Sequence, residues 1–112
     1  MIKGMHALIY TTDAEAARAF IRDKLGWPFQ DAGDGWLIFD VPEADIGFHP
    51  SDTRFHNISF YCDDIEATVA EMKTKGVGFT EPIREEDWGR VTAFELPGAG
   101  PMQLYQPKYS KD

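Results

Sequence analysis

The sequence of 112 residues contains only one cysteine, Cys62, and therefore has no internal disulfide. A single thiol gives no indication of an oxidising compartment, and we expect Cys62 to be a half-buried structural residue. No apolar run approaches the roughly 20 residues that a membrane-spanning helix needs. The first six residues also lack the hydrophobic stretch of a secretory signal. The expected location is the cytoplasm, with no membrane partner.

Basic residues are scarce as well. The chain has 11 Lys and Arg against 19 Asp and Glu, which gives a net charge of −8. A surface of this charge repels phosphate backbones, and the basic residues form no stripe that would offset the repulsion. We therefore expect no nucleic-acid partner. Hydrophobic residues make up 43% and aromatic residues 13%, which is typical of a folded protein, and the length fits one domain over residues 1–112.

The apolar patterns predict the same order of elements, several strands and one helix, in each half of the sequence. Period-2 alternation is typical of strands, whereas apolar residues at helical spacing between a capping residue and a glycine indicate a helix. In the first half, we expect strands at 5–11, 36–41 and 46–49, a short one near 29, and a helix after the capping-box pair Thr12 and Glu15. In the second half, we expect strands at 57–61, 91–96 and 102–105, a short one near 79, and a helix over 63–75.

The two halves also match as an internal repeat. A shift of about 51 positions pairs Asp13 with Asp64 at the two helix starts, and the best shift becomes about 55 in the final strands. The repeat predicts module one at about 1–52 and module two at about 53–112, each with the order βαβββ. An unduplicated α+β sandwich, such as a ferredoxin-like fold, is the alternative.

Three segments make the sequence similar to a known superfamily. The first runs from His6 to Asp13 and continues through the following helix to Leu25-Gly26. The second runs from 62–67 through to 75–76. The third combines Trp88-Gly89 with 97–100 and 103–107. Together they resemble the vicinal-oxygen-chelate superfamily, which includes glyoxalase I, bleomycin-resistance proteins and extradiol dioxygenases. The resemblance implies an α+β fold in which two βαβββ modules form a cupped mixed sheet around a cavity, with the helices outside. It also implies a homodimer.

Metal-using relatives take one ligand from the first strand and one from the last strand of each module. The resemblance places His6 in the first of these positions and Gln103, instead of the usual Glu, in the last. The second module offers Asn57 or its neighbour His56, and the choice stays open because a one-residue slip changes the face of a strand. His49 is a further candidate. The resemblance thus implies a weakly held divalent ion (Zn, Ni, Fe or Mn) at His6 and His49, or none.

Aromatic and polar side chains are expected to line the cup, because ligand pockets combine apolar walls with a few polar groups. These candidates are Tyr10, Asn57, Ser59, Tyr61, Trp88, Arg90, Gln103 and Tyr105. Arg90 would contact an anionic group of the ligand or form a surface ion pair with Glu85 or Glu86. No catalytic residue is assigned, since Gln103 stands where relatives have a Glu.

We therefore expect a protein that handles a small molecule in the cup between its modules. One form of this function is metal-assisted isomerase, lyase or dioxygenase chemistry, in which the ion polarises the substrate oxygens. The alternative is a metal-free protein that binds and sequesters a drug or metabolite, and its acidity would suit a cationic ligand. A third possibility is a structural dimer with a vestigial pocket.

Overall fold

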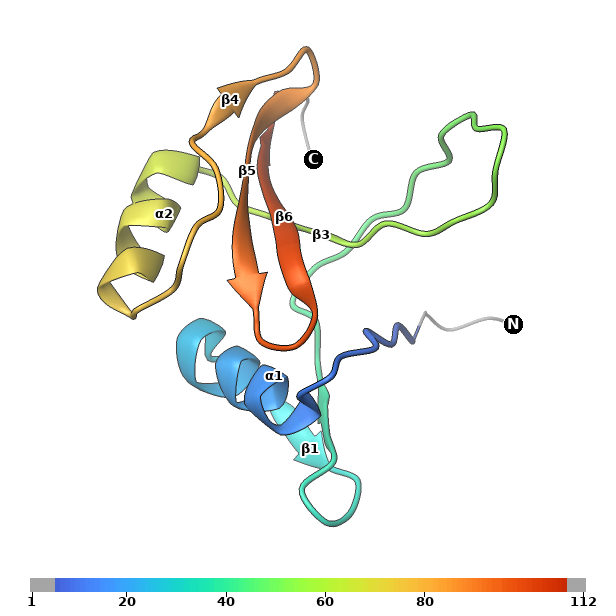
Figure 1. Cartoon of the computed structure of the whole chain (residues 1–112), viewed down its shortest axis with the longest axis vertical. Helices are drawn as coiled ribbons and strands as arrows, with labels where there is room; N and C mark the ends of the chain where they lie inside the picture. Colours follow the sequence, from blue (N-terminus) through green and yellow to red (C-terminus); the bar gives the residue numbers. More distant parts are fainter. Residues whose placement is uncertain (1–5, 109–112) are drawn as a thin grey trace.

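The computed structural model describes residues 6–108, which fold into two helices and two β-sheets (Figure 1). The first helix, α1 (Ala14–Phe20), continues into a π-helical turn, η1 (Ile21–Leu25), and the second is α2 (Ile65–Thr74). Strands β1 (Phe29–Asp31) and β2 (Leu37–Phe39) form an antiparallel hairpin. The other sheet has the order β3-β6-β5-β4, formed by Ser59–Tyr61, Gly100–Pro107, Gly89–Leu96 and Arg84–Glu85. Over this described range, neither helix has the length and apolar character needed to span a bilayer.

The second module has the order βαβββ, with β4 at Arg84–Glu85 as a strand that the sequence did not predict. Strand β3 runs parallel to β6, and β5 pairs antiparallel with both β6 and β4. At the short strand expected near 79, Phe79 forms an isolated bridge with Phe94. Helix α2 begins where the Asp64 side chain accepts a hydrogen bond from the Ala67 backbone N–H at 3.1 Å. This bond satisfies a donor that the first helical turn leaves without a partner.

Helix α1 begins in the same way, with Asp13 accepting from the Ala16 N–H at 3.1 Å. Asp13 is thus the capping residue, whereas the spacing of Thr12 and Glu15 predicted a capping box one position earlier. The Thr12 backbone N–H instead donates to the Gly98 carbonyl at 2.9 Å. The cap therefore moves by one residue because a long-range bond engages Thr12.

The first module differs from its expected form. Residues 6–11 and 46–49, both predicted as strands, form none in the structure, and β1 and β2 alone represent its sheet within residues 6–108. A strand forms only where another strand can pair with its backbone groups. Within the described part of this single chain no strand pairs with these two segments, and Figure 1 shows them as extended connections. The cup implied by the resemblance is not formed by these residues and stays a prediction.

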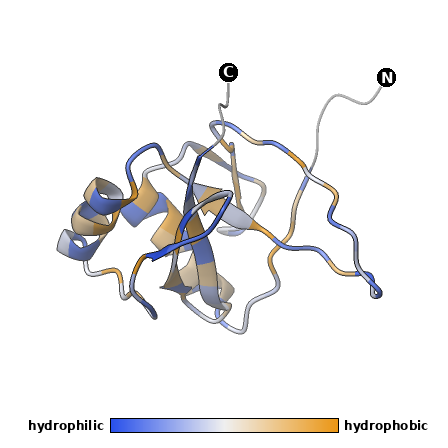
Figure 2. Cartoon of the chain, turned by 90° about the horizontal axis from the view of Figure 1, so that it is seen from above, coloured by the Kyte–Doolittle hydropathy of each residue, from blue (hydrophilic) through white to orange (hydrophobic). Residues whose placement is uncertain are grey.

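The hydrophobic core lies between the helices and one face of the four-stranded sheet. Phe94 on β5 is fully buried, and its ring stacks on that of Phe20 with centroids 5.7 Å apart. Phe20 ends α1, so the helix of the first module packs on the sheet of the second. Ile65 and Met72 bring α2 to the same core. Figure 2 shows hydrophobic residues at this interface and also along the extended segments on the opposite side.

Glycine at position 98 allows the last hairpin to contact the start of α1. Gly98 has a φ of 73°, and a Cβ atom there would collide with the Thr11 Oγ1 and the Asp13 backbone N. The Thr11 hydroxyl donates to the Pro97 carbonyl at 2.9 Å. This close backbone approach requires glycine, because any side chain would push the two modules apart.

Candidate ligand-binding face

Five of the predicted ligand-contacting residues gather on the face of the four-stranded sheet that lies opposite the core. Ser59 pairs with Gln103, and Tyr61 with Tyr105, in the register of β3 and β6. Residues paired across two strands project to the same face, while the alternating Phe60 and Leu104 belong to the core. Trp88, which directly precedes β5, adds its ring beside Tyr105. We call this set, Ser59, Tyr61, Trp88, Gln103 and Tyr105, the aromatic face.

The rings of the aromatic face contact one another in a row. The centroid of Tyr105 lies 5.5 Å from that of Trp88 and 6.2 Å from that of Tyr61. The Gln103 side-chain amide donates to the Ser59 hydroxyl at 3.1 Å, which fixes the orientation of the amide. Trp88 keeps 43% of its surface exposed. The face thus combines solvent-accessible aromatic surface with a small number of oriented polar groups.

A carboxylate that the sequence analysis missed lies at the edge of this face. The Tyr61 hydroxyl donates a hydrogen bond to Glu43, which belongs to the segment between β2 and β3. Glu43 lies between the segments 36–41 and 46–49 that were predicted as strands, and its partner is 18 residues away. Sequence spacing could not reveal such a contact. The structure thereby brings a carboxylate to the face on which Gln103 replaces the Glu of metal-using relatives.

Two other predicted ligand-contacting residues, Tyr10 and Arg90, lie away from the aromatic face. Tyr10 is 87% exposed and lines a hollow of about 280 Å³ beside Trp36. Arg90 forms ion pairs with Glu85 at 2.8 Å and with Glu66 of α2 at 3.6 Å, so its guanidinium lies on the helix side of the sheet. The ion pair with Glu85 is the one that the sequence analysis considered for Arg90.

Lys108 also binds Glu85, at 2.9 Å. The hydrogen bond from Lys108, together with the positive charges of Lys108 and Arg90, lowers the pKa of Glu85. Glu85 therefore stays ionised when the pH falls below the usual range of a Glu, and the ion pair persists there. This cluster of charges ties β4 to β5 and to the end of β6, next to the loop that holds Trp88.

The predicted metal ligands His6 and His49 lie on segments that form no helix or strand. His6, His49 and Asn57 are exposed, as is His56, and the His49 Nδ1 lies 2.7 Å from the Pro50 carbonyl oxygen. Over residues 6–108, no three His, Cys, Asp or Glu side chains are close enough to share an ion. A tightly bound divalent metal usually needs three or more protein donors. The described donor set therefore does not fit one, and we derive no catalytic step through a metal.

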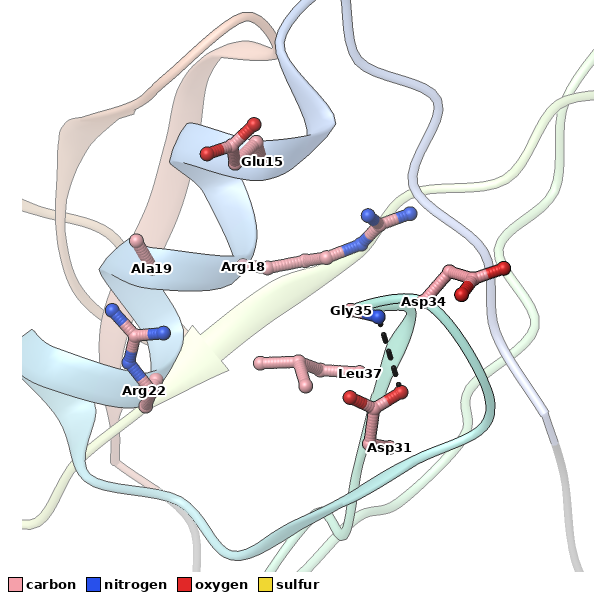
Figure 3. A pocket seen from close by; sticks show the side chains of 8 residues that line it. All are labelled: Glu15, Arg18, Ala19, Arg22, Asp31, Asp34, Gly35 and Leu37. Carbon is pink, nitrogen blue, oxygen red and sulfur yellow. Dashed lines mark hydrogen bonds between the residues drawn. The ribbon is translucent and has the colours of Figure 1, made fainter.

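A second hollow, of about 490 Å³, lies between α1 and the β1–β2 hairpin (Figure 3). Arg18 reaches across it toward the hairpin, and its guanidinium carbon sits 4.7 Å from the centroid of the Trp36 ring. On the hairpin side, the Asp31 carboxylate accepts from the Gly33 and Gly35 N–H groups and shapes the turn. Arg22 is already paired with Asp23 at 2.7 Å. Arg18, Arg22 and Asp31 thus serve local contacts, and charged residues outnumber the apolar Ala19 and Leu37 in the lining of this hollow, unlike in most ligand sites.

Cys62 is half-buried behind Tyr105. Its thiol donates to the Tyr105 carbonyl oxygen at 3.7 Å, and burial raises the pKa of the thiol. The thiolate, which is the nucleophilic form, is therefore disfavoured. Cys62 has the structural role expected from the sequence.

A family model, that of the Glyoxalase/Bleomycin resistance protein/Dioxygenase superfamily, matches residues 5–100. The chain belongs to this superfamily. The match covers most of the sequence and confirms the resemblance identified from its three segments. A search of the curated proteins finds no match.

Solved structures of superfamily members share the fold. A member from Sphaerobacter thermophilus has a TM-score of 0.66 at 25% identity, with 94% of this chain and 98% of that chain covered. TnmS3, an antibiotic binding protein from a Streptomyces species, has a TM-score of 0.65 at 22% identity, with 96% and 100% covered. A lactoylglutathione lyase from Agrobacterium tumefaciens has a TM-score of 0.62 at 17% identity, with 93% and 96% covered. Because a binding protein and a lyase have the same fold, the fold alone does not define the activity.

Proposed function

We propose that this superfamily member binds a small organic molecule on the aromatic face. The observation that carries the proposal is the row formed by Trp88, Tyr105 and Tyr61, with the amide of Gln103 beside it. Aromatic surface with a few oriented polar groups is the usual composition of a ligand site. The structural likeness to TnmS3, an antibiotic binding protein, supports this class of function.

We further propose that two copies of the chain associate and enclose the face. The segments 6–11 and 46–49 have the composition of strands, and Phe48 exposes 90% of its surface. Other large apolar side chains that are at least 38% exposed on or near these segments are Leu8, Ile9, Tyr10, Val41, Ile46, Phe55 and Ile58. Large exposed apolar surfaces of soluble proteins commonly mark interaction sites, and unpaired strand segments readily pair with another chain. A second copy would supply both the cover and the strand partner.

Substituting Trp88 with leucine is expected to weaken ligand binding about tenfold, because an aromatic contact in a ligand site contributes on the order of 1 kcal/mol. The ligand is first found by screening a library of drug-like molecules and metabolites for those that raise the melting temperature, since a ligand that binds only the folded state stabilises it. Titration calorimetry then compares wild type with Trp88→Leu. The matched control is Trp36→Leu, because Trp36 is similarly exposed but lies on the other module. A ligand whose affinity falls in the control and not in Trp88→Leu would contradict the proposal.

Metal-assisted isomerase, lyase or dioxygenase chemistry is the second candidate, favoured by His6 at the ligand position of metal-using relatives. We expect protein refolded with Zn, Ni, Fe or Mn and then dialysed to retain well below one ion per chain, because the donors of one chain do not converge. Elemental analysis by mass spectrometry measures the ion content. One ion per chain, lost in His6→Ala at unchanged melting temperature, would establish the metal-dependent function instead.

A further inference from the structure

The aromatic face carries negative charge at its edges. The Glu43 carboxylate accepts the hydrogen bond of Tyr61, so it is held next to the ring at one end of the row. Glu95 on β5 is exposed. It lies on the same face of the sheet as Gln103, because Ala93, two residues before Glu95 on the same strand, pairs with Gln103. Glu43 thus borders the row of rings, and Glu95 lies further along the same face, opposite Pro101.

Basic groups near the face are already paired with carboxylates. Arg84 on β4 lies opposite Val91 and therefore on this side of the sheet, but it forms ion pairs with both Glu81 and Glu86. Arg90 points to the helix side and pairs with Glu85. These arginines are therefore not available to attract an anionic ligand. The net charge of −8 for the whole chain adds a negative potential.

Rings and carboxylates together favour a cation. The face of an aromatic ring carries partial negative charge and attracts an ammonium or a delocalised cation within about 6 Å of its centroid. A nearby carboxylate strengthens this attraction, and the same carboxylate repels an anion. A flat cation stacked on the ring of Trp88 or Tyr105, whose planes are 69° apart, would meet the edge of the other ring, with its charge toward Glu43.

We infer that the ligand of the aromatic face is an organic cation, in which a positively charged nitrogen is part of, or attached to, a flat aromatic system. This inference rests on the proposed function and specifies the class of its ligand. Glu43 is the residue that selects for charge, and Trp88 and Tyr105 are the residues that bind the ring system. Gln103 and Ser59 contribute polar contacts that do not depend on the charge of the ligand.

Three probes of nearly equal shape separate charge from stacking: N-methylquinolinium, neutral quinoline and the anion quinoline-2-carboxylate. In titrations of the full chain at pH 8, we expect N-methylquinolinium to bind about tenfold more tightly than quinoline, and the anion to bind more weakly than both. Glu43→Gln should remove most of the preference for the cation and leave quinoline binding unchanged. Glu15→Gln, which removes a carboxylate from the α1 side, is the matched control and should retain the preference.

Each result has a defined meaning. Equal affinities for N-methylquinolinium and quinoline in wild type would overturn the inference and leave small-molecule binding at the face intact. A preference for the cation that persists in Glu43→Gln, with an unchanged melting temperature, would also overturn it. If Trp88→Leu binds all three probes as wild type does, binding occurs elsewhere and the proposed function itself fails. If none of the probes binds, the inference is wrong, and the library screen decides the proposed function independently.

Discussion

Replacing Phe94 with alanine is expected to lower the free energy of unfolding by about 3–5 kcal/mol, which is a large part of the 5–15 kcal/mol typical of a native domain. The Phe94 side chain is fully buried and stacks on Phe20 with an interplanar angle of 1°. It also makes edge contacts with Phe60 and Phe79, at centroid distances of 5.4 and 6.2 Å. Its loss would leave a cavity between β5 and α1, the helix that belongs to the other module.

Urea denaturation at a fixed protein concentration measures this change. The concentration is fixed because a protein that associates has a stability that depends on it. Phe94→Leu is the matched variant, since it keeps most of the volume, and it should cost distinctly less than alanine. Glu71→Ala, an exposed change on α2, should stay within about 0.5 kcal/mol of wild type. A loss below about 1 kcal/mol for Phe94→Ala would show that the core is not centred on this ring.

A chain with Ile46 and Phe48 both changed to glutamate is expected to be monomeric, whereas under the proposed association wild type has a mass of about twice 12.7 kDa. The two side chains expose 61% and 90% of their surface in the single chain. If a second copy covers them, each added carboxylate becomes a buried and unpaired charge, which costs several kcal/mol. The dissociation constant should therefore rise by about a hundredfold or more.

Size-exclusion chromatography with light scattering measures the mass over a range of protein concentrations. The variant adds negative charge to a chain that already has a net charge of −8, so the control must add the same charge elsewhere. Ala67→Glu with Thr74→Glu does so on exposed positions of α2, and this control should remain dimeric. A wild-type mass of one chain at all concentrations would contradict the proposed association.

The sequence predicted the second module well because its signals are local. Asp64 at the helix start and the alternation along β5 and β6 each indicate an element without knowledge of its neighbours. The sequence analysis also grouped Ser59 and Tyr61 at one site, and in the structure both lie on the face of the sheet away from the helices. The family was recognised partly from segments of this module and partly from His6–Asp13 and Leu25-Gly26 of the first.

The remaining features depend on contacts between distant parts of the chain. The alternation at 6–11 has the period of a strand, but a strand also needs a neighbour, which the described part of one chain does not provide there. The apolar face of α1 was identified, yet nothing in its spacing indicates that Phe20 packs on the sheet of the other module. Glu43 was missed for a related reason, because only folding brings it to Tyr61.

The bonds from Thr11 and Thr12 to residues 97 and 98 also set an order of events during synthesis. They join positions 86 residues apart, so α1 leaves the ribosome long before its docking surface exists. At about 5–20 residues per second, the delay is roughly 4–17 s. During this time the apolar side of α1, with Phe20, has no native surface to cover it. Helix α1 therefore reaches its final position only after the turn at 97–98 has been synthesised.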